Sequence, residues 1–318
     1  MERRLLPVNA LIALCNSGNL YPDTLKRSGY YVAGIEVPAV TDDGTVVIDV
    51  VMFHPERNVI LAGEAKSGAN VDVEQARRYG QLRADAVIQA ASINVRTHGE
   101  LRIQPLYCCP AENVVRVMRG LQVAGVQCPV LAFGSESIEH RGAPFLDLVI
   151  EEEFKWPIRV PGPPPRIIPV DDKSPDRLFD DLVLAALIAE MSKKRTEVMV
   201  PVLAAQAIPH LGVYAAAARN GLIRKVDSAV RRIAGKDATT FEYLGKIGSR
   251  EYALIRFLRS PEDSTPQGRT QVYQAIRRPH RKRPQESVRS DGTQMKLFDE
   301  MADEFLQLDG MVGEEGQE

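Results

Sequence analysis

The sequence contains few of the residues that build cross-linked or zinc-bound folds. It has four cysteines, none in a CxxC pair, and five histidines that lie far apart. A disulfide framework and a zinc site are therefore not expected, and the pattern favours a reduced intracellular protein. No apolar run reaches the roughly 18 residues that a membrane span needs. We accordingly expect a cytoplasmic protein without a membrane partner.

The chain also lacks a strong net charge. The formal charge is −2 over 318 residues, so no global basic field attracts nucleic acid, and any polyanion site must come from local patches. Hydrophobic residues make up 44% and charged residues 26% of the chain, as in ordinary globular proteins. The length is sufficient for two domains with a sizeable core.

Residues 1–155 predict an α/β domain with a mixed sheet. A first helix precedes three β-rich stretches at residues 30–40, 45–54 and 59–66, which turn-forming sequences connect. A helix over residues 71–83 follows, with Asp72 and Glu74 suited to its N-terminus, and then come strand, helix and strand patterns. The order αβββαβ at the start of this series is typical of helices packed against a mixed sheet.

Residues 156–173 predict a stiff linker, because the stretch from Trp156 to Val170 holds six prolines. Residues 174–260 then predict a helix capped by Ser174 with Pro175 in its first turn, shorter helices and a β-hairpin. Three helices followed by a hairpin indicate a small winged helix-turn-helix domain. The charged residues 261–318 predict a largely disordered tail.

Three charged residues stand within the most strand-like part of the sequence. If the hairpin turns symmetrically about Glu56 and Arg57, paired residues have numbers that sum to 113, and Asp49 lies across from Glu64. Their Cβ atoms are then about 5 Å apart. Lys66 is two residues beyond Glu64 and shares its face. The register therefore predicts that two carboxylates and one amine meet at one point.

Two facing carboxylates in an apolar sheet repel each other, and a divalent cation relieves this repulsion. Hard oxygen ligands favour Mg²⁺ or Mn²⁺, which polarises a phosphodiester. Lys66 either orients or deprotonates a water molecule on the metal, or it stabilises the pentavalent phosphorus. The alternative is a Glu64–Lys66 ion pair on an edge strand, with Asp49 solvated beside it.

The pattern of Asp49, fourteen residues and then Glu64-Ala65-Lys66 resembles the PD-(D/E)XK nuclease superfamily. This resemblance implies a restriction-endonuclease-like core in which Asp49, Glu64 and Ala65 hold the metal and Lys66 assists the chemistry. Many relatives also carry an acidic residue on the first helix. The sequence has no clear match there, and Glu36 on the first predicted strand is the candidate for that additional acid.

The next predicted helix adds a second match. Gln75 and Tyr79 lie at i and i+4 on one helix face, and this pattern resembles the RecB-like branch of the superfamily. The resemblance implies that both residues join the catalytic set and contact nucleic acid. Arg77 and Arg78 add positive charge for nucleic-acid binding.

The C-terminal domain carries a further basic cluster. Arg224, Lys225, Arg231 and Arg232 lie on the predicted recognition helix, where arginine and lysine reach phosphates and guanine edges of DNA. The alternatives are that these charges solvate an exposed helix face and that the domain binds a partner protein.

The tail contains one short peptide pattern. Gln294, Leu297 and Phe298 in QMKLF resemble the peptide that binds the bacterial sliding clamp. The alternative is a short amphipathic helix. The basic run at residues 277–283 is either a phosphate-binding segment or a solvated linker.

These patterns together predict a Mg²⁺-dependent deoxyribonuclease in DNA repair, recombination or anti-phage, restriction-type defence. Two alternatives stay open. One is a non-catalytic DNA- or protein-binding adaptor with a vestigial nuclease fold, and the other is an RNase.

Overall fold

The structure is a computed structural model, and it describes residues 3–18, 20–95, 99–193, 195–246 and 251–258. The contacts divide the chain into two units, residues 1–273 and 274–318, and all described residues belong to the first. The predicted disordered tail, with its basic run and the peptide Gln294–Phe298, lies outside the described residues. Among the helices that the structure describes, none is long and apolar enough to cross a membrane.

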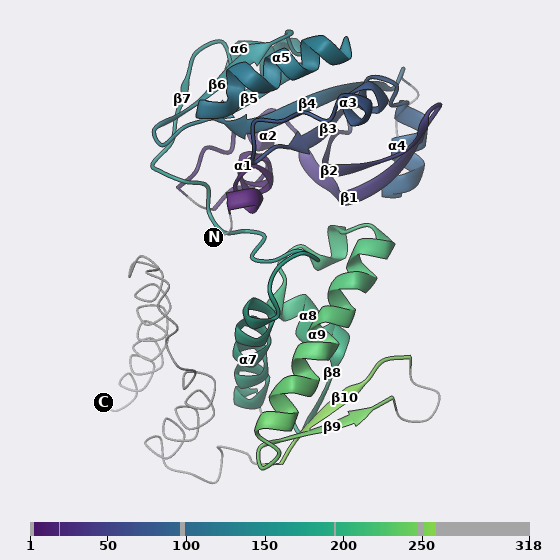
Figure 1. Cartoon of the computed structure of the whole chain (residues 1–318), viewed down its shortest axis with the longest axis vertical. Coiled ribbons are helices and arrows are strands. Elements are labelled where there is room, and N and C mark those ends of the chain that lie inside the picture. Colours follow the sequence, from purple (N-terminus) through teal and green to yellow (C-terminus); the bar gives the residue numbers. More distant parts are fainter. Residues whose placement is uncertain (1–2, 19, 96–98, 194, 247–250, 259–318) are drawn as a thin grey trace, which may run out of the picture. The chain divides into compact units, whose positions relative to one another are not determined.

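A mixed sheet of seven strands, in the spatial order β1 to β7, forms the centre of the N-terminal part (Figure 1). The strands are β1 (Tyr31–Thr41), β2 (Gly44–His54), β3 (Val59–Ala65), β4 (Arg102–Pro110), β5 (Pro129–Phe133), β6 (Ser137–Gly142) and β7 (Ile158–Arg159). Strands β3, β4 and β5 pair in parallel, and the other neighbours pair antiparallel. The predicted α/β class with a mixed sheet is confirmed, and β6 and β7 extend it beyond the predicted strands.

Helices cover both faces of this sheet. The helices of this part are α1 (Leu6–Leu14), α2 (Thr24–Arg27), α3 (Val73–Gly80), α4 (Ala84–Ala91), α5 (Val114–Ala124) and α6 (Leu148–Glu153), with 3-10 turns η1 (Arg3–Leu5) and η2 (Ala111–Asn113). Buried side chains of α3, α4 and α5 pack with one face of the sheet, while Leu11 of α1 reaches Gly63 of β3 from the other face. The site described below lies on the α3 face.

The helix predicted over residues 71–83 is shorter in the structure, which corrects that prediction. Helix α3 begins after Asp72, whose side chain caps it by accepting from the amide of Gln75, and it ends at Gly80. Glycine is a poor helix former, and Arg83 is extended at the start of the separate helix α4. The predicted hairpin register is confirmed: five pairs, from Val50↔Gly63 to His54↔Val59, have numbers that sum to 113.

The C-terminal part contains three packed helices and a small antiparallel sheet (Figure 1). Its elements are α7 (Asp176–Ser192), β8 (Glu197–Met199), α8 (Val200–Ala207), η3 (Leu211–Val213), α9 (Ala216–Lys236), β9 (Phe241–Gly245) and β10 (Leu254–Phe257). The three strands lie in the order β8-β10-β9, so β8 adds a strand to the predicted hairpin.

The predicted cap of α7 is wrong. Pro175 is extended and occupies the N-cap position, so the helix begins at Asp176. The hydroxyl of Ser174 donates to Asp171 instead, at 3.0 Å. Pro175 itself has a non-helical ψ of 144°, so the first helical residue is Asp176 and Ser174 lies one residue before the cap position.

The proline-rich stretch is attached to the first helix. Asn9 of α1 is fully buried, and its side-chain oxygen accepts from the amides of Ile167 and Ile168 at 2.8 and 2.6 Å. Its side-chain nitrogen donates to the carbonyl of Ile168 at 3.1 Å. Arg4 forms an ion pair with Asp171 a few residues further on. These bonds connect the start of the chain to the segment that precedes α7.

Candidate active site

Strands β2 and β3 separate at the position of the two predicted acids. Their ladder ends at Val50↔Gly63, and beyond it the amide of Ala65 donates to Oδ2 of Asp49 at 2.7 Å. A side-chain oxygen thus satisfies an amide that a longer ladder would pair with the main chain. We call this divergence the fork. Asp49 is half-buried there, at the point where β3 ends.

Glu64 is the centre of a compact polar cluster beside the fork. Its side chain is 5% exposed, and its Oε1 lies 2.7 Å from Nζ of Lys66 and 3.1 Å from the donating Nε2 of Gln75. The hydroxyl of Tyr79 lies 2.5 Å from its Oε2. The Oε1 atom of Gln75 in turn accepts from Lys66 at 3.0 Å. The Gln75 amide therefore bridges the carboxylate and the amine, which fixes the orientation of both.

Tyr79 connects the two strands of the fork. Its hydroxyl lies 3.1 Å from the carbonyl of Val47 on β2, besides its contact with Glu64 on β3. A phenol has one proton, so it donates to one of these acceptors at a time. Gln75 and Tyr79 reach the site together because they stand one helical turn apart on α3.

The surroundings of Asp49 and Tyr79 raise the pKa of both side chains. Burial and the nearby Glu64 carboxylate raise the pKa of Asp49 from 3.8 to about 8. Burial, with the charges of Glu64 and Asp49, also raises the pKa of Tyr79 well above its ordinary value. Asp49 thus binds a proton more tightly than a solvated carboxylate does, because a second negative charge beside Glu64 is unfavourable.

The donor set fits a hard divalent cation. Asp49 and Glu64 present carboxylate oxygens, and Ala65 between Glu64 and Lys66 adds only main-chain groups. Mg²⁺ binds through one or two carboxylates and keeps several of its waters. Among the described residues, no group of three or more His, Cys, Asp or Glu side chains could hold a metal ion. Two carboxylates are a ligand set that suits Mg²⁺ or Mn²⁺.

Glu36 lies opposite Asp49 in the register of β1 and β2. The pairs on either side are Ile35↔Val50 and Val37↔Ile48, and Glu36 itself has a positive φ of 51°. This left-handed conformation is uncommon for a residue with a side chain and marks a local irregularity of the strand. Burial and the carboxylates of two aspartates on the segment before α7 raise the pKa of Glu36.

The two arginines of α3 lie at the edge of this site with their own partners. Arg77 is exposed and forms an ion pair with Glu74 at 2.5 Å. Arg78 donates to the carbonyl of Thr45 at 3.3 Å. The structure brings the predicted catalytic residues Lys66, Gln75 and Tyr79 together around Glu64, with Asp49 bonded to the adjoining amide. Arg77 and Arg78, which the sequence predicts to contact nucleic acid, lie outside that cluster.

Residues 5–107 match the family model of the MJECL32 domain. The match runs from η1 into β4, and it includes the fork and the cluster of Glu64, Lys66, Gln75 and Tyr79. No curated protein and no solved structure matches the chain significantly.

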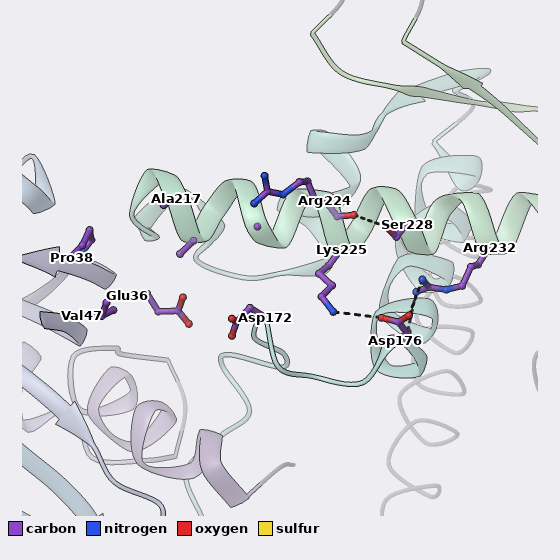
Figure 2. Close-up of a pocket in the computed structure, with 12 residues that line it drawn as sticks. Glu36, Pro38, Val47, Asp172, Asp176, Ala217, Arg224, Lys225, Ser228 and Arg232 are labelled. Atoms are coloured by element: carbon purple, nitrogen blue, oxygen red, sulfur yellow. Dashed lines mark hydrogen bonds and ion pairs between the residues drawn. The ribbon is translucent and has the colours of Figure 1, made fainter. Parts of the chain in front are cut away.

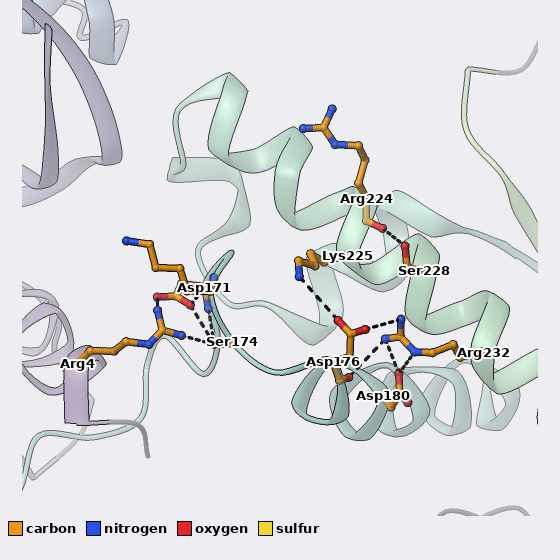
Figure 3. A network of polar contacts seen from close by, with 10 residues as sticks. Arg4, Asp171, Ser174, Asp176, Asp180, Arg224, Lys225, Ser228 and Arg232 are labelled. Carbon is orange, nitrogen blue, oxygen red and sulfur yellow. Dashed lines mark hydrogen bonds and ion pairs between the residues drawn. The ribbon is translucent and has the colours of Figure 1, made fainter.

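The four basic residues predicted on the recognition helix lie on α9, and three of them have acidic partners. Figure 3 shows the partners of Lys225 and Arg232. Arg232 contacts Asp180 at 2.7 Å, and Lys225 lies 3.7 Å from Asp176. Arg231 pairs with an aspartate one turn away on the same helix, at 2.8 Å. Among the described residues, the guanidinium of Arg224 takes part in no hydrogen bond or ion pair.

Sequence reasoning missed a cleft of about 730 Å³ that Glu36 and Val47 line together with residues of α9 (Figure 2). Asp172, which the sequence places in the predicted linker, also lines it. The only signal in the sequence was the unusual acid on the first strand. The cleft itself unites segments that are more than a hundred residues apart, so no local pattern announces it.

Proposed function

We propose that the protein is a Mg²⁺-dependent nuclease that hydrolyses phosphodiester bonds in DNA. The observation that carries this proposal is the cluster at the fork, where Glu64 contacts Lys66, Gln75 and Tyr79, and Asp49 binds the adjoining amide. This arrangement supports the resemblance to the PD-(D/E)XK nucleases, because the acids and the amine of that pattern meet on one face.

Asp49 and Glu64 would hold the cation, which when bound polarises the phosphodiester and neutralises developing charge. Tyr79 holds one oxygen of Glu64 in place at 2.5 Å. The Lys66 amine also donates to Oε1 of Gln75 at 3.0 Å. Lys66 would therefore still have a hydrogen-bond partner if Glu64 turned to a bound cation. The amine then presents a positive charge and protons beside the reacting phosphate.

The C-terminal part supports a winged-helix assignment. Its order α7-β8-α8-α9-β9-β10, with a three-stranded sheet beside three helices, is consistent with a helix-turn-helix module followed by a wing. Ion pairs with aspartates of α7, and one pair within α9, reduce the positive charge available to contact a DNA major groove. We therefore propose that this module acts mainly together with the nuclease part of the chain and does not read a DNA major groove by itself.

The decisive experiment compares wild type with Lys66→Ala on single-stranded, duplex, branched and RNA substrates, with and without magnesium. We expect magnesium-dependent cleavage that falls by at least about a hundredfold in the variant, because a positioned proton donor or base typically contributes that much. Lys155→Ala is the matched control, since Lys155 is exposed and pairs with Glu152 on α6.

Circular dichroism and manganese titration check that Lys66→Ala still folds and that its acids still bind a cation. Equal cleavage by wild type and Lys66→Ala rejects the proposal. Cleavage of RNA alone redirects it to an RNase.

A further inference from the structure

The cleft between β1–β2 and α9 has two facing apolar walls (Figure 2). Pro38 and Val47 form the sheet wall, and Ala217, Ala218 and Gly221 form the helix wall. Val47 is 48% exposed although it is a large apolar residue in the middle of a strand. A cleft of about 730 Å³ is in the size range of small-ligand sites. A volume of this size is on the order of one or two nucleotides.

The lining combines polar groups of opposite charge. The carboxylates of Glu36 and Asp172 point toward each other, and the side chain of Arg224 extends along α9 toward Ala217, away from these carboxylates in this view (Figure 2). The two remaining cations of the lining are already paired with Asp176. Carboxylates accept hydrogen bonds from the amino groups of bases, and a guanidinium binds phosphate. The lining therefore complements a nucleotide better than a simple polyanion.

The slot adjoins the fork. Glu36 lies across from Asp49 in the strand register, and the carbonyl of Val47 accepts from Tyr79, which also contacts Glu64. The main chain of Ile35 accepts from the amide of Ala215 at 3.0 Å, so the start of α9 is bonded to β1 next to Glu36. One wall of the slot and the fork thus share strand β2, which carries both Val47 and Asp49.

We propose that this slot binds one nucleotide of an unpaired nucleic-acid strand, with its base between the apolar walls and its phosphate on Arg224. That this nucleotide lies next to the bond to be cleaved rests on the proposed function. The binding of the nucleotide in the slot does not. The substrate class that follows is a single strand or the unpaired part of a branched structure.

The test measures fluorescence anisotropy of a labelled unpaired DNA oligonucleotide in EDTA at low ionic strength, so that no cleavage occurs. Gly221→Leu fills the slot. A Cβ atom at this glycine meets nothing within 4 Å, and leucine favours a helix, so the fold is expected to persist. Gly235→Leu is the matched control, because Gly235 lies on the same helix with equal space and outside the slot.

Arg224→Glu tests the phosphate contact, and Arg119→Glu on the exposed face of α5 controls for the change of net charge. We expect Arg224→Glu to weaken binding of the unpaired strand by about tenfold or more, which is the loss that a charge-assisted hydrogen bond predicts. We expect a loss of the same size for Gly221→Leu, because its side chain occupies the space of the base. The two controls should bind as wild type does, and a duplex of the same sequence should bind more weakly. An RNA strand of the same sequence shows whether the sugar matters.

Wild-type affinity in both slot variants overturns the inference, as does a wild-type protein that binds no unpaired strand. If magnesium-dependent cleavage is absent while the slot variants still lose binding, the proposed hydrolysis fails and this inference stands. If Lys66-dependent cleavage is present while the slot variants bind normally, only this inference fails.

Discussion

Removing the charge of Asp49 is expected to stabilise the metal-free protein. Asp49→Asn keeps the size of the side chain and an oxygen that accepts from Ala65. In wild type, burial and Glu64 raise the pKa of Asp49 from 3.8 to about 8. Between these pH values the folded state holds a proton that the unfolded chain has released. Wild type therefore loses stability as pH rises from about 4 to about 8, and the variant does not.

The size of this effect follows from the same shift. One pH unit corresponds to about 1.4 kcal/mol, so the change from 3.8 to about 8 sets an upper limit of about 6 kcal/mol. Asp49 is only half-buried, so solvent and relaxation of its surroundings reduce the effect. We expect Asp49→Asn to be more stable than wild type by about 1–3 kcal/mol at pH 8, and by almost nothing at pH 4.

Urea unfolding in EDTA at a series of pH values measures this difference. Asp85→Asn is the control, because Asp85 is exposed, pairs with Arg83 and has a lowered pKa. Added manganese should then stabilise wild type with a logarithmic dependence on concentration and leave Asp49→Asn unchanged. A variant that is no more stable than wild type at pH 8 in EDTA refutes the reasoning, since the Asp49 charge then costs nothing in the folded state.

Four further substitutions test the architecture of the protein by chemical denaturation. Asn9→Ala should destabilise the protein by about 2–4 kcal/mol, because the main chain at Ile168 loses buried partners; an unchanged midpoint contradicts this role. Gly63→Ala should cost about 1–3 kcal/mol, because its Cβ would lie 2.9 Å from a main-chain oxygen of β2, and wild-type stability would show that the strands give way. Asp180→Ala should cost about 1–2 kcal/mol and Asp176→Ala less, because their side chains are 13% and 59% exposed; the reverse order would contradict the argument from burial.

The hairpin register was predictable because a two-residue period and a tight turn leave few alternatives. Apolar residues on both faces of β2 and β3 predicted a central position in the sheet, and the sum of 113 holds for every pair of their ladder. The pairing of Glu64 with Lys66 follows from their spacing on one strand. Sequence alone therefore predicted the core of the candidate site.

Other features depend on contacts that no local pattern encodes. The point at which the ladder ends is set by the Asp49 side chain taking the amide of Ala65. The sequence predicts a stiff linker at residues 156–173, and no local pattern indicates that the buried side chain of Asn9 binds this segment. The basic residues of α9 predict a DNA-binding surface, although aspartates of α7 form ion pairs with two of them. Each outcome was decided by a partner distant in sequence.

The fork gives any ligand that joins Asp49 to Glu64 a mechanical role. Beyond the pair Val50↔Gly63, strands β2 and β3 have no further pair in their ladder. A ligand that bridges Asp49 and Glu64 would therefore connect the two strands where the ladder does not. Loading the site would then stiffen the open end of the hairpin, and amide exchange near Ala65 would slow even before a substrate arrives.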